Sequence, residues 1–133
     1  MVAARSPAVA QLGTLLRART ARRELAPAQL HAVFRLVEDD LSAPLTVADL
    51  AARAHVSVFH FSRLFRGSTG LSPYQYLLQR RLAHARELLT ATELPVAQIA
   101  VRCGFADQSH LTRLARRHLG STPAALRSAA RGR

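Results

Sequence analysis

Hydrophobic residues recur at helical spacing along most of this chain. From Leu30 to Leu41 they follow the i, i+3, i+4, i+7 pattern, and Pro27 stands where a helix would begin. This pattern predicts an amphipathic helix that ends near residues 42–44. A weaker pattern over residues 9–19 predicts a short helix, which is either a frayed leader or a docking or dimerisation helix.

The strongest feature of the sequence is an internal repeat. The segment LTVADLAARAHVSVFHFSRLFRGSTGLSP, which begins at Leu45, matches LPVAQIAVRCGFADQSHLTRLARRHLGSTP, which begins at Leu94. Leu45 and Leu94 are 49 residues apart, whereas Gly70 and Gly120 are 50 apart, so one residue is inserted between these points. The insertion falls where a turn would tolerate it, and the repeat predicts two copies of one structural unit.

Each copy predicts a short helix, a tight turn and a longer helix. Polar residues suited to helix N-caps precede the predicted helices: Thr46, with Asp49 placed as in a capping box, then Ser57 and Asp107. Glycines suited to helix ends and prolines suited to helix starts follow: Gly70, Pro73, Gly120 and Pro123. Residues 73–89 predict one long helix between the copies, and residues 123–128 predict a last short one.

These elements divide the chain into a basic leader or linker helix, a folded domain and a loose basic tail, at residues 1–26, 27–128 and 129–133. Within the domain we place two helix-turn-helix units at about residues 46–68 and 95–118, joined by the helix over residues 73–89. A helix, a short turn and a second helix form an arrangement that fits the major groove of DNA.

Composition favours a compact helical protein in a reducing compartment. Hydrophobic residues make up 49% of the 133 residues, aromatic residues only 5%, and there is no Trp. Cys103 is the single cysteine, and the six His show no metal-ligand spacing. No apolar stretch approaches the roughly 20 residues of a membrane span. We therefore expect a cytoplasmic, nucleoid-associated protein with no membrane partner, no metal and no cofactor.

The charge distribution indicates a polyanionic partner. Five Arg and no acidic residue give residues 1–23 a charge of +5, two Arg against five acids give residues 24–61 −3, and twelve Arg against three acids give residues 62–133 +9. The total is +11, and all nineteen basic residues are Arg. Charge alone does not separate nucleic acid from an anionic membrane surface.

The second helix of each copy carries the candidate DNA-contacting residues. The residues expected to face the core are Phe61, Leu64, Phe65, Leu111 and Leu114. The side chains predicted to read bases are Phe59, Ser62, Arg63, Gln108, Ser109, Thr112 and Arg113, and those predicted to contact phosphates are Thr46, Ser57, Arg66, Arg116 and Arg117. Gln suits adenine, Arg suits guanine, and Phe59 suits a thymine methyl group.

A charged helix face is often simply solvated, so this interpretation has a plain alternative. Arg63 and Arg113 recur at the same place in both copies, each beside Ser or Thr, which favours DNA contact. For Arg80, Arg81 and Arg86 on the connecting helix, pairing with Glu87 or solvation is equally expected.

From about Leu30 to Arg127 the sequence resembles the DNA-binding domain of the AraC/XylS family of transcription regulators. The most specific part is VAQIAVRCGFADQSHLTRLARRHLGSTPAALR, with the pairs Ile99-Ala100 and Gly104-Phe105. The resemblance implies an all-α fold of seven helices, in which a long central helix joins two helix-turn-helix subdomains. It also implies sequence-specific binding to double-stranded promoter DNA, usually with activation through RNA polymerase.

This sequence departs from the family pattern in two respects. Leu111 and Ala115 stand where the family more often has Phe, so we expect the second unit to be less tightly packed or filled by a neighbour. Most members also carry an N-terminal effector domain, so this chain is either a stand-alone regulator or a piece of a longer protein, and a homodimer partner stays open. The acidic group at residues 38–40 is a hypothetical polymerase contact, against a solvated helix end.

Two other classes of function compete with this one. A sequence-tolerant nucleoid-type or antagonist module would bind DNA without its own transcriptional output. An enzyme is not expected, because Ser57, His60 and Asp49 lack the strand-to-helix elbow of a catalytic triad. Cys103 is a small residue in a tight turn rather than a methyl acceptor or redox sensor.

Overall fold

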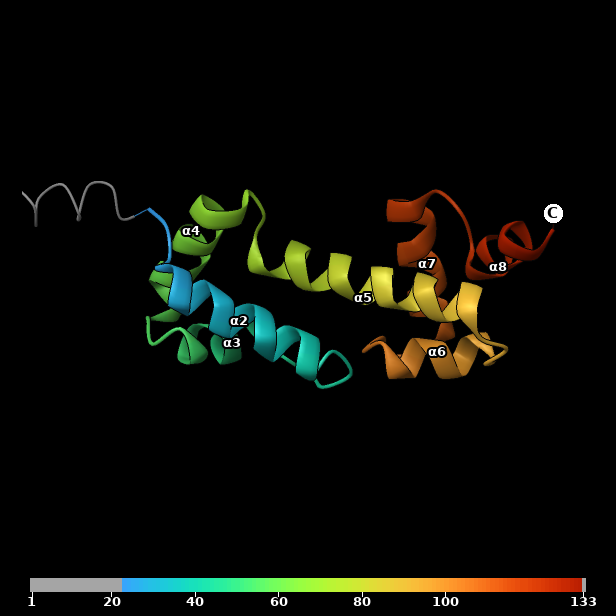
Figure 1. Ribbon diagram of the computed structural model, residues 1–133, viewed down its shortest axis with the longest axis horizontal. Helices are drawn as coiled ribbons and strands as arrows, with labels where there is room; N and C mark the ends of the chain where they lie inside the picture. The colour runs from blue at the N-terminus through green and yellow to red at the C-terminus, as the bar shows by residue number, and fades with distance from the viewer. Residues whose placement is uncertain (1–22, 133) are drawn as a thin grey trace, which may run out of the picture. The chain divides into compact units, whose positions relative to one another are not determined.

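The computed structural model describes residues 23–132, which form seven helices and no strand (Figure 1). The helices are α2 (Pro27–Asp39), α3 (Val47–Arg53), α4 (Val58–Thr69), α5 (Pro73–Ala91), α6 (Val96–Arg102), α7 (Gln108–Leu119) and α8 (Pro123–Arg131). All of these helices were predicted from the sequence pattern, and the all-α class is confirmed. The predicted leader helix over residues 9–19 lies outside the described residues.

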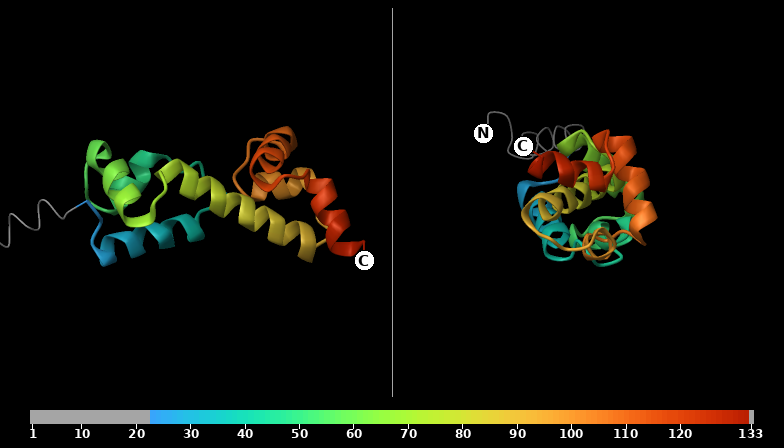
Figure 2. Two further views of the ribbon diagram at one scale, coloured as in Figure 1. Left: turned by 90° about the horizontal axis from the view of Figure 1, so that it is seen from above. Right: turned by 90° about the vertical axis from the view of Figure 1, so that its right-hand side faces the viewer.

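The described chain divides into two compact units. Unit one contains the chain up to Val33 together with residues 47–73, and unit two contains residues 34–46 and the chain from Tyr74 onward. The boundary therefore falls within α2 and at the start of α5. Each unit holds one pair of packed helices, α3 with α4 and α6 with α7, as Figures 1 and 2 show.

The core of unit one is built on the apolar face of α4. Phe61, Leu64 and Phe65 are buried there, as predicted, and the rings of Phe61 and Phe65 lie 5.5 Å apart between centroids. The chain that leads into α2 is fixed against the end of α4, because Leu25 is buried and its N–H donates to Ser68 Oγ at 2.8 Å. Gly67 makes this possible, since a Cβ there would overlap the Arg23 carbonyl.

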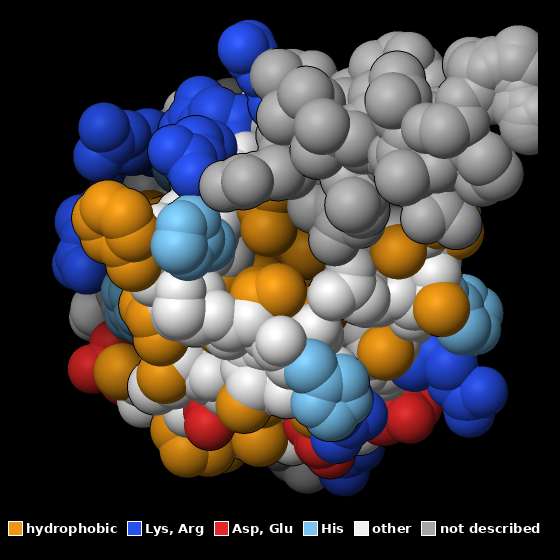
Figure 3. Space-filling model, turned by 90° about the vertical axis from the view of Figure 1, so that its left-hand side faces the viewer, with side chains coloured by type: hydrophobic (Ala, Val, Ile, Leu, Met, Phe, Trp, Pro, Cys, Tyr) orange, Lys and Arg blue, Asp and Glu red, His pale blue; other side chains and the backbone are white. Residues whose placement is uncertain are grey.

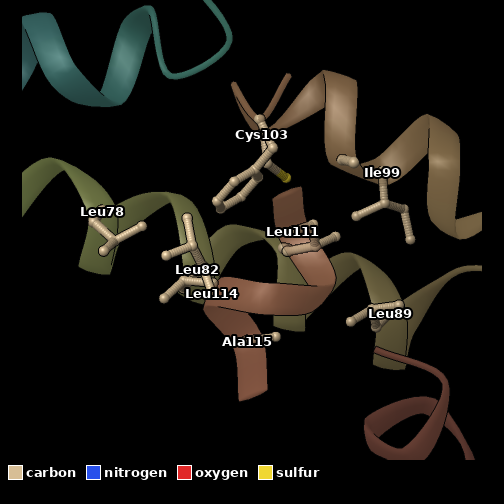
Figure 4. Close-up of a cluster of buried hydrophobic side chains, with 11 residues drawn as sticks. Leu78, Leu82, Leu89, Ile99, Cys103, Leu111, Leu114 and Ala115 are labelled. Atoms are coloured by element: carbon tan, nitrogen blue, oxygen red, sulfur yellow. The ribbon is translucent and has the colours of Figure 1, made fainter. Parts of the chain in front are cut away.

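The core of unit two joins α5, α6 and α7 (Figure 4). Its buried side chains include Leu82 and Leu89 from α5, Ile99 from α6, and Leu111 and Ala115 from α7. Ala115 is only 1% exposed. Ala115 is therefore enclosed by its neighbours, and the expectation that this unit is less tightly packed or filled by a neighbour stays a prediction.

The last helix continues beyond its predicted end. α8 extends to Arg131, three residues past Ser128, instead of giving way to a loose tail. Arg131 Nη2 lies 2.8 Å from Glu93 Oε2 and donates to the Thr92 carbonyl at 3.0 Å. These contacts fix the last residues of α8 against the segment between α5 and α6. The local sequence pattern contains no sign of them, so it did not predict that the helix continues.

Three arginines within unit two bind protein groups that the sequence did not suggest. Arg80 forms a two-bond ion pair with Glu38 at 2.7 and 3.1 Å, a partner that was not among the alternatives weighed for it. Arg81 donates to the carbonyls of Leu41 and Ala43 at 3.0 and 2.7 Å, and burial lowers its pKa. Arg127 donates to two carbonyls, those of Leu89 and Thr92, at 3.1 Å each.

Replacing Arg81 by alanine should lower the free energy of unfolding by about 2 kcal/mol, because two backbone carbonyls lose charge-assisted hydrogen bonds. Chemical denaturation of the purified variant measures this loss. Arg86→Ala serves as the control, since Arg86 is exposed on the same helix α5 and should change stability by less than about 0.5 kcal/mol. Equal stabilities of the two variants would show that the Arg81 bonds contribute little.

Candidate nucleic-acid interface

Each long helix of the repeat begins with a side-chain cap. In α4 the N-cap is Ser57, whose Oγ accepts the His60 N–H at 3.2 Å. In α7 it is Asp107, whose Oδ1 accepts the His110 N–H at 2.8 Å. These caps satisfy backbone groups that a helix start leaves unpaired, and both were predicted. α3 begins directly after Thr46, also as predicted.

The turn that precedes each long helix contains one residue with positive φ. In unit two this residue is Gly104, with φ of 89°, where the Phe105 N–H donates to the Ala100 carbonyl at 2.9 Å. In unit one it is His55, with φ of 60°, where the Val56 N–H donates to the Ala51 carbonyl at 3.1 Å. The left-handed residue reverses the chain and aims the following helix away from the first.

Both long helices end in the same way. Gly70 and Gly120 adopt φ of 81° and 76°, and their N–H groups donate to the carbonyls of Arg66 and Arg116. The predicted role of these glycines as helix ends is therefore confirmed. The two units thus repeat the same cap, helix and stop, so that equivalent residues occupy equivalent positions on α4 and α7.

The polar faces of α4 and α7 remain at the surface. The predicted DNA-contacting residues that are exposed are Thr46, Ser57, Phe59, Ser62, Arg63, Arg66, Gln108, Ser109, Arg113, Arg116 and Arg117, and Thr112 is half-buried. Within unit two, Gln108, Ser109, Thr112, Arg113 and Arg116 line an open hollow of about 490 Å³ on α7. The structure thus gathers the predicted residues of α7 on one surface, and their contacts with DNA stay predictions.

The sequence pattern did not predict that His60 and His110 take part in the hydrogen bonds at the starts of α4 and α7. Nδ1 of His110 accepts the Ala106 N–H at 3.1 Å, which completes a reciprocal cap with Asp107. His60 Nδ1 lies 2.9 Å from Ser57 Oγ. The repeat could have indicated a shared role, because His60 and His110 match at the repeat offset of 50 residues.

The two other side chains that we considered for catalysis or reactivity, Ser57 and Cys103, lie in structural positions. Ser57 Oγ caps α4, so its contact with His60 belongs to the helix start rather than to a triad. Cys103 is fully buried, and burial raises the pKa of its thiol to about 11, so the thiol stays protonated at neutral pH.

Within residues 23–132, no group of three or more His, Cys, Asp or Glu side chains is placed to hold a metal ion. None of the helices in this range is both long and apolar enough to cross a membrane.

Two capped helix-turn-helix units with basic exposed faces define a protein of the nucleic-acid-binding class. Comparison with known proteins then identifies the family. A family model described as a helix-turn-helix domain matches residues 50–129. The chain therefore belongs to the AraC-type helix-turn-helix family of transcription regulators.

Individual relatives and structures agree with this assignment. The chain is 34% identical to the transcriptional activator RhaS of Klebsiella pneumoniae over 95% of its own length and 46% of that protein. It is also 34% identical to the probable regulator LumQ of Photobacterium leiognathi, over 65% of its own length and 35% of LumQ. The DNA-binding domain of the global transcriptional factor AdpA, crystallised with a target DNA, has a TM-score of 0.75 and 39% identity over 78% of this chain and 94% of that one. The chain thus spans less than half of the curated relatives' length.

Proposed function

We propose that this chain is a sequence-specific regulator that binds double-stranded DNA by placing α4 and α7 in two successive segments of the major groove. The observation that carries the proposal is a matched pair of residues at the surface of each helix: Ser62 and Arg63 are exposed on α4, and Arg113 is exposed beside the half-buried Thr112 on α7. Each helix buries its other face in the core of its own unit, so these side chains are the ones available to base edges.

Charge and phosphate-contacting groups support the same proposal. Arg66, Arg116 and Arg117 are exposed in the last turns of α4 and α7, where they suit the sugar-phosphate backbone that flanks the groove. The predicted phosphate contacts Thr46 and Ser57 lie at helix starts, where the helix dipole favours anions. AdpA, whose DNA-binding domain was crystallised with a target DNA, has a closely similar fold.

The regulatory output of the bound protein is a further part of the proposal. RhaS and RhaR are named as transcriptional activators, so we propose activation, with RNA polymerase as the partner. The acidic group at residues 38–40 stays the proposed contact, although Glu38 is already paired with Arg80. This leaves Asp39 and Asp40 as the exposed carboxylates to substitute in a transcription assay.

Selection from a random double-stranded DNA library at near-physiological salt tests the proposal. We expect an asymmetric motif with two enriched blocks about 10 base pairs apart, the separation of successive major-groove segments on one side of the duplex. A single enriched block would mean that one unit alone reads bases. Binding without enrichment, with a steep fall in affinity as salt rises, would instead identify a sequence-tolerant module of the nucleoid or antagonist type.

A further inference from the structure

The two proposed recognition helices, α4 and α7, differ at their first two residues, although both contain the same His, Arg, Leu and Arg further along, at residues 60, 63, 64 and 66 and at residues 110, 113, 114 and 116. Val58 and Phe59 open α4, whereas Gln108 and Ser109 open α7 at the equivalent positions, 50 residues on. Val58 is 50% exposed and Phe59 is 82% exposed. Unit one therefore presents two apolar side chains at the helix start, where unit two presents two polar ones.

The histidine that follows Phe59 supports its ring. The rings of Phe59 and His60 meet edge to face, with centroids 5.3 Å apart and an interplanar angle of 82°. His60 is in turn bonded through Nδ1 to Ser57 Oγ at 2.9 Å. The cap, the imidazole and the phenyl ring thus form a connected series that restricts the directions in which Phe59 can point.

The equivalent histidine of unit two has a different role. His110 packs edge to face on Phe105, with ring centroids 5.5 Å apart, and its Nδ1 accepts the Ala106 N–H. Its ring therefore braces the turn that precedes α7, and the residue before it, Ser109, is a small polar group. The arrangement that projects an apolar ring from the start of a recognition helix is a property of unit one.

A phenyl ring that is 82% exposed gains free energy when it meets another apolar group. In the major groove that group is the 5-methyl of thymine, and 5-methylcytosine presents the same methyl at the same place. Arg63 lies four residues along the same face of α4, and Arg66 lies beyond it. The positive charge of these two arginines favours DNA, rather than an apolar protein surface, as the partner that covers Phe59. Figure 3 shows exposed hydrophobic, His and Arg side chains close together on one face of the molecule.

We propose that Phe59, with Val58 beside it, recognises the 5-methyl group of a pyrimidine in the half-site read by unit one, and that unit two imposes no such requirement. The proposal rests on the DNA binding proposed above. It makes the two half-sites chemically different: both contain a base for the matched arginines Arg63 and Arg113, and one also contains a methylated pyrimidine.

Replacement of thymine by uracil tests the proposal, because this exchange removes the methyl group and leaves base pairing intact. Duplexes carrying the selected site, with one thymine at a time replaced by deoxyuridine, are titrated by fluorescence anisotropy against the full chain. We expect affinity to fall about fourfold, the effect of one methyl-sized group, at one or two adjacent positions of one half-site. Replacements in the other half-site should have no effect.

Variants of the protein assign the effect to Phe59. Phe59→Ala should bind thymine and uracil duplexes equally, whereas Ser109→Ala, its matched control in unit two, should keep the wild-type difference. Because Phe59 is exposed, its variant should unfold at the wild-type temperature. A further duplex pair, with cytosine or 5-methylcytosine at the sensitive position, shows which pyrimidine suffices. If the methyl group alone is read, 5-methylcytosine restores affinity. If the carbonyl of thymine is read as well, only thymine restores it.

Several results would overturn the proposal. They are equal wild-type affinity for thymine and uracil duplexes throughout, a uracil effect that persists in Phe59→Ala, or a selected half-site without any methylated pyrimidine. In each case the chain still binds a defined site, and the proposed function stands. Failure of the library selection to enrich any site would instead overturn both proposals.

Discussion

Replacing Gly104 by alanine is expected to lower the free energy of unfolding of unit two by at least about 3 kcal/mol. Gly104 adopts φ of 89°, a conformation that costs an L-residue with a side chain about 1–2 kcal/mol. A Cβ there would also overlap the Leu41 carbonyl and the Arg81 guanidinium. The methyl group would therefore force apart the bond by which Arg81 holds the chain after α2.

Gly120→Ala separates these two causes. Gly120 has φ of 76°, yet a Cβ there would have no neighbour within 4 Å. This control should therefore lose only the conformational part, about 1–2 kcal/mol. Denaturant unfolding of both variants, followed by circular dichroism, measures the difference. If the two variants lost equal stability, the close packing of the turn against Leu41 and Arg81 would not contribute.

The features that were predicted correctly are those that depend on neighbours in sequence. A helix cap such as Ser57 or Asp107 acts on a backbone N–H three residues away, so the local sequence contains both partners. Gly70 and Gly120 follow the same logic, and the buried faces of α4 and α7 follow from helical periodicity. The internal repeat then strengthens each prediction, because both copies must agree.

The features that were missed depend on residues far apart in the chain. Arg81 and Leu41 are separated by 40 positions, and Arg127 and Leu89 by 38. A count of charges does not distinguish one arginine from another. In the structure, Arg81 and Arg127 donate hydrogen bonds to backbone carbonyls. The end of α8 was missed for the same reason, since Arg131 reaches back to Glu93.

One feature lay in the repeat itself but used an unexpected residue. His55 and Gly104 match at the offset of 49 residues, and both adopt positive φ. Glycine at such a position is a recognisable signal, while histidine is only modestly tolerated there. A shared backbone conformation can therefore be inferred from the better-suited copy, even where the other copy uses a residue that gives no signal alone.

Replacing Arg63 and Arg113 together by alanine is expected to weaken binding to the selected DNA site by about 2–6 kcal/mol. Each arginine that pairs with a guanine edge contributes about 1–3 kcal/mol to discrimination. The two side chains belong to separate units, so their effects should add. Binding isotherms on the selected site and on a scrambled duplex, at several salt concentrations, measure both affinity and specificity. Both side chains are exposed, so thermal unfolding should be unchanged.

The matched control is the double variant of Arg66 and Arg116, which lie three residues further along the same helices. A recognition helix presents its first half to base edges, while its later turns leave the groove and meet the backbone. Arg63 and Arg113 lie in the first halves of α4 and α7, and Arg66 and Arg116 lie in the second halves. The control should therefore weaken selected and scrambled DNA alike and reduce the salt slope by about 2, one phosphate contact for each arginine. A different result would be that both double variants shift the salt slope equally and keep the same preference for the selected site. All four arginines would then act as phosphate contacts. Base reading would have to come from the shorter polar side chains beside them.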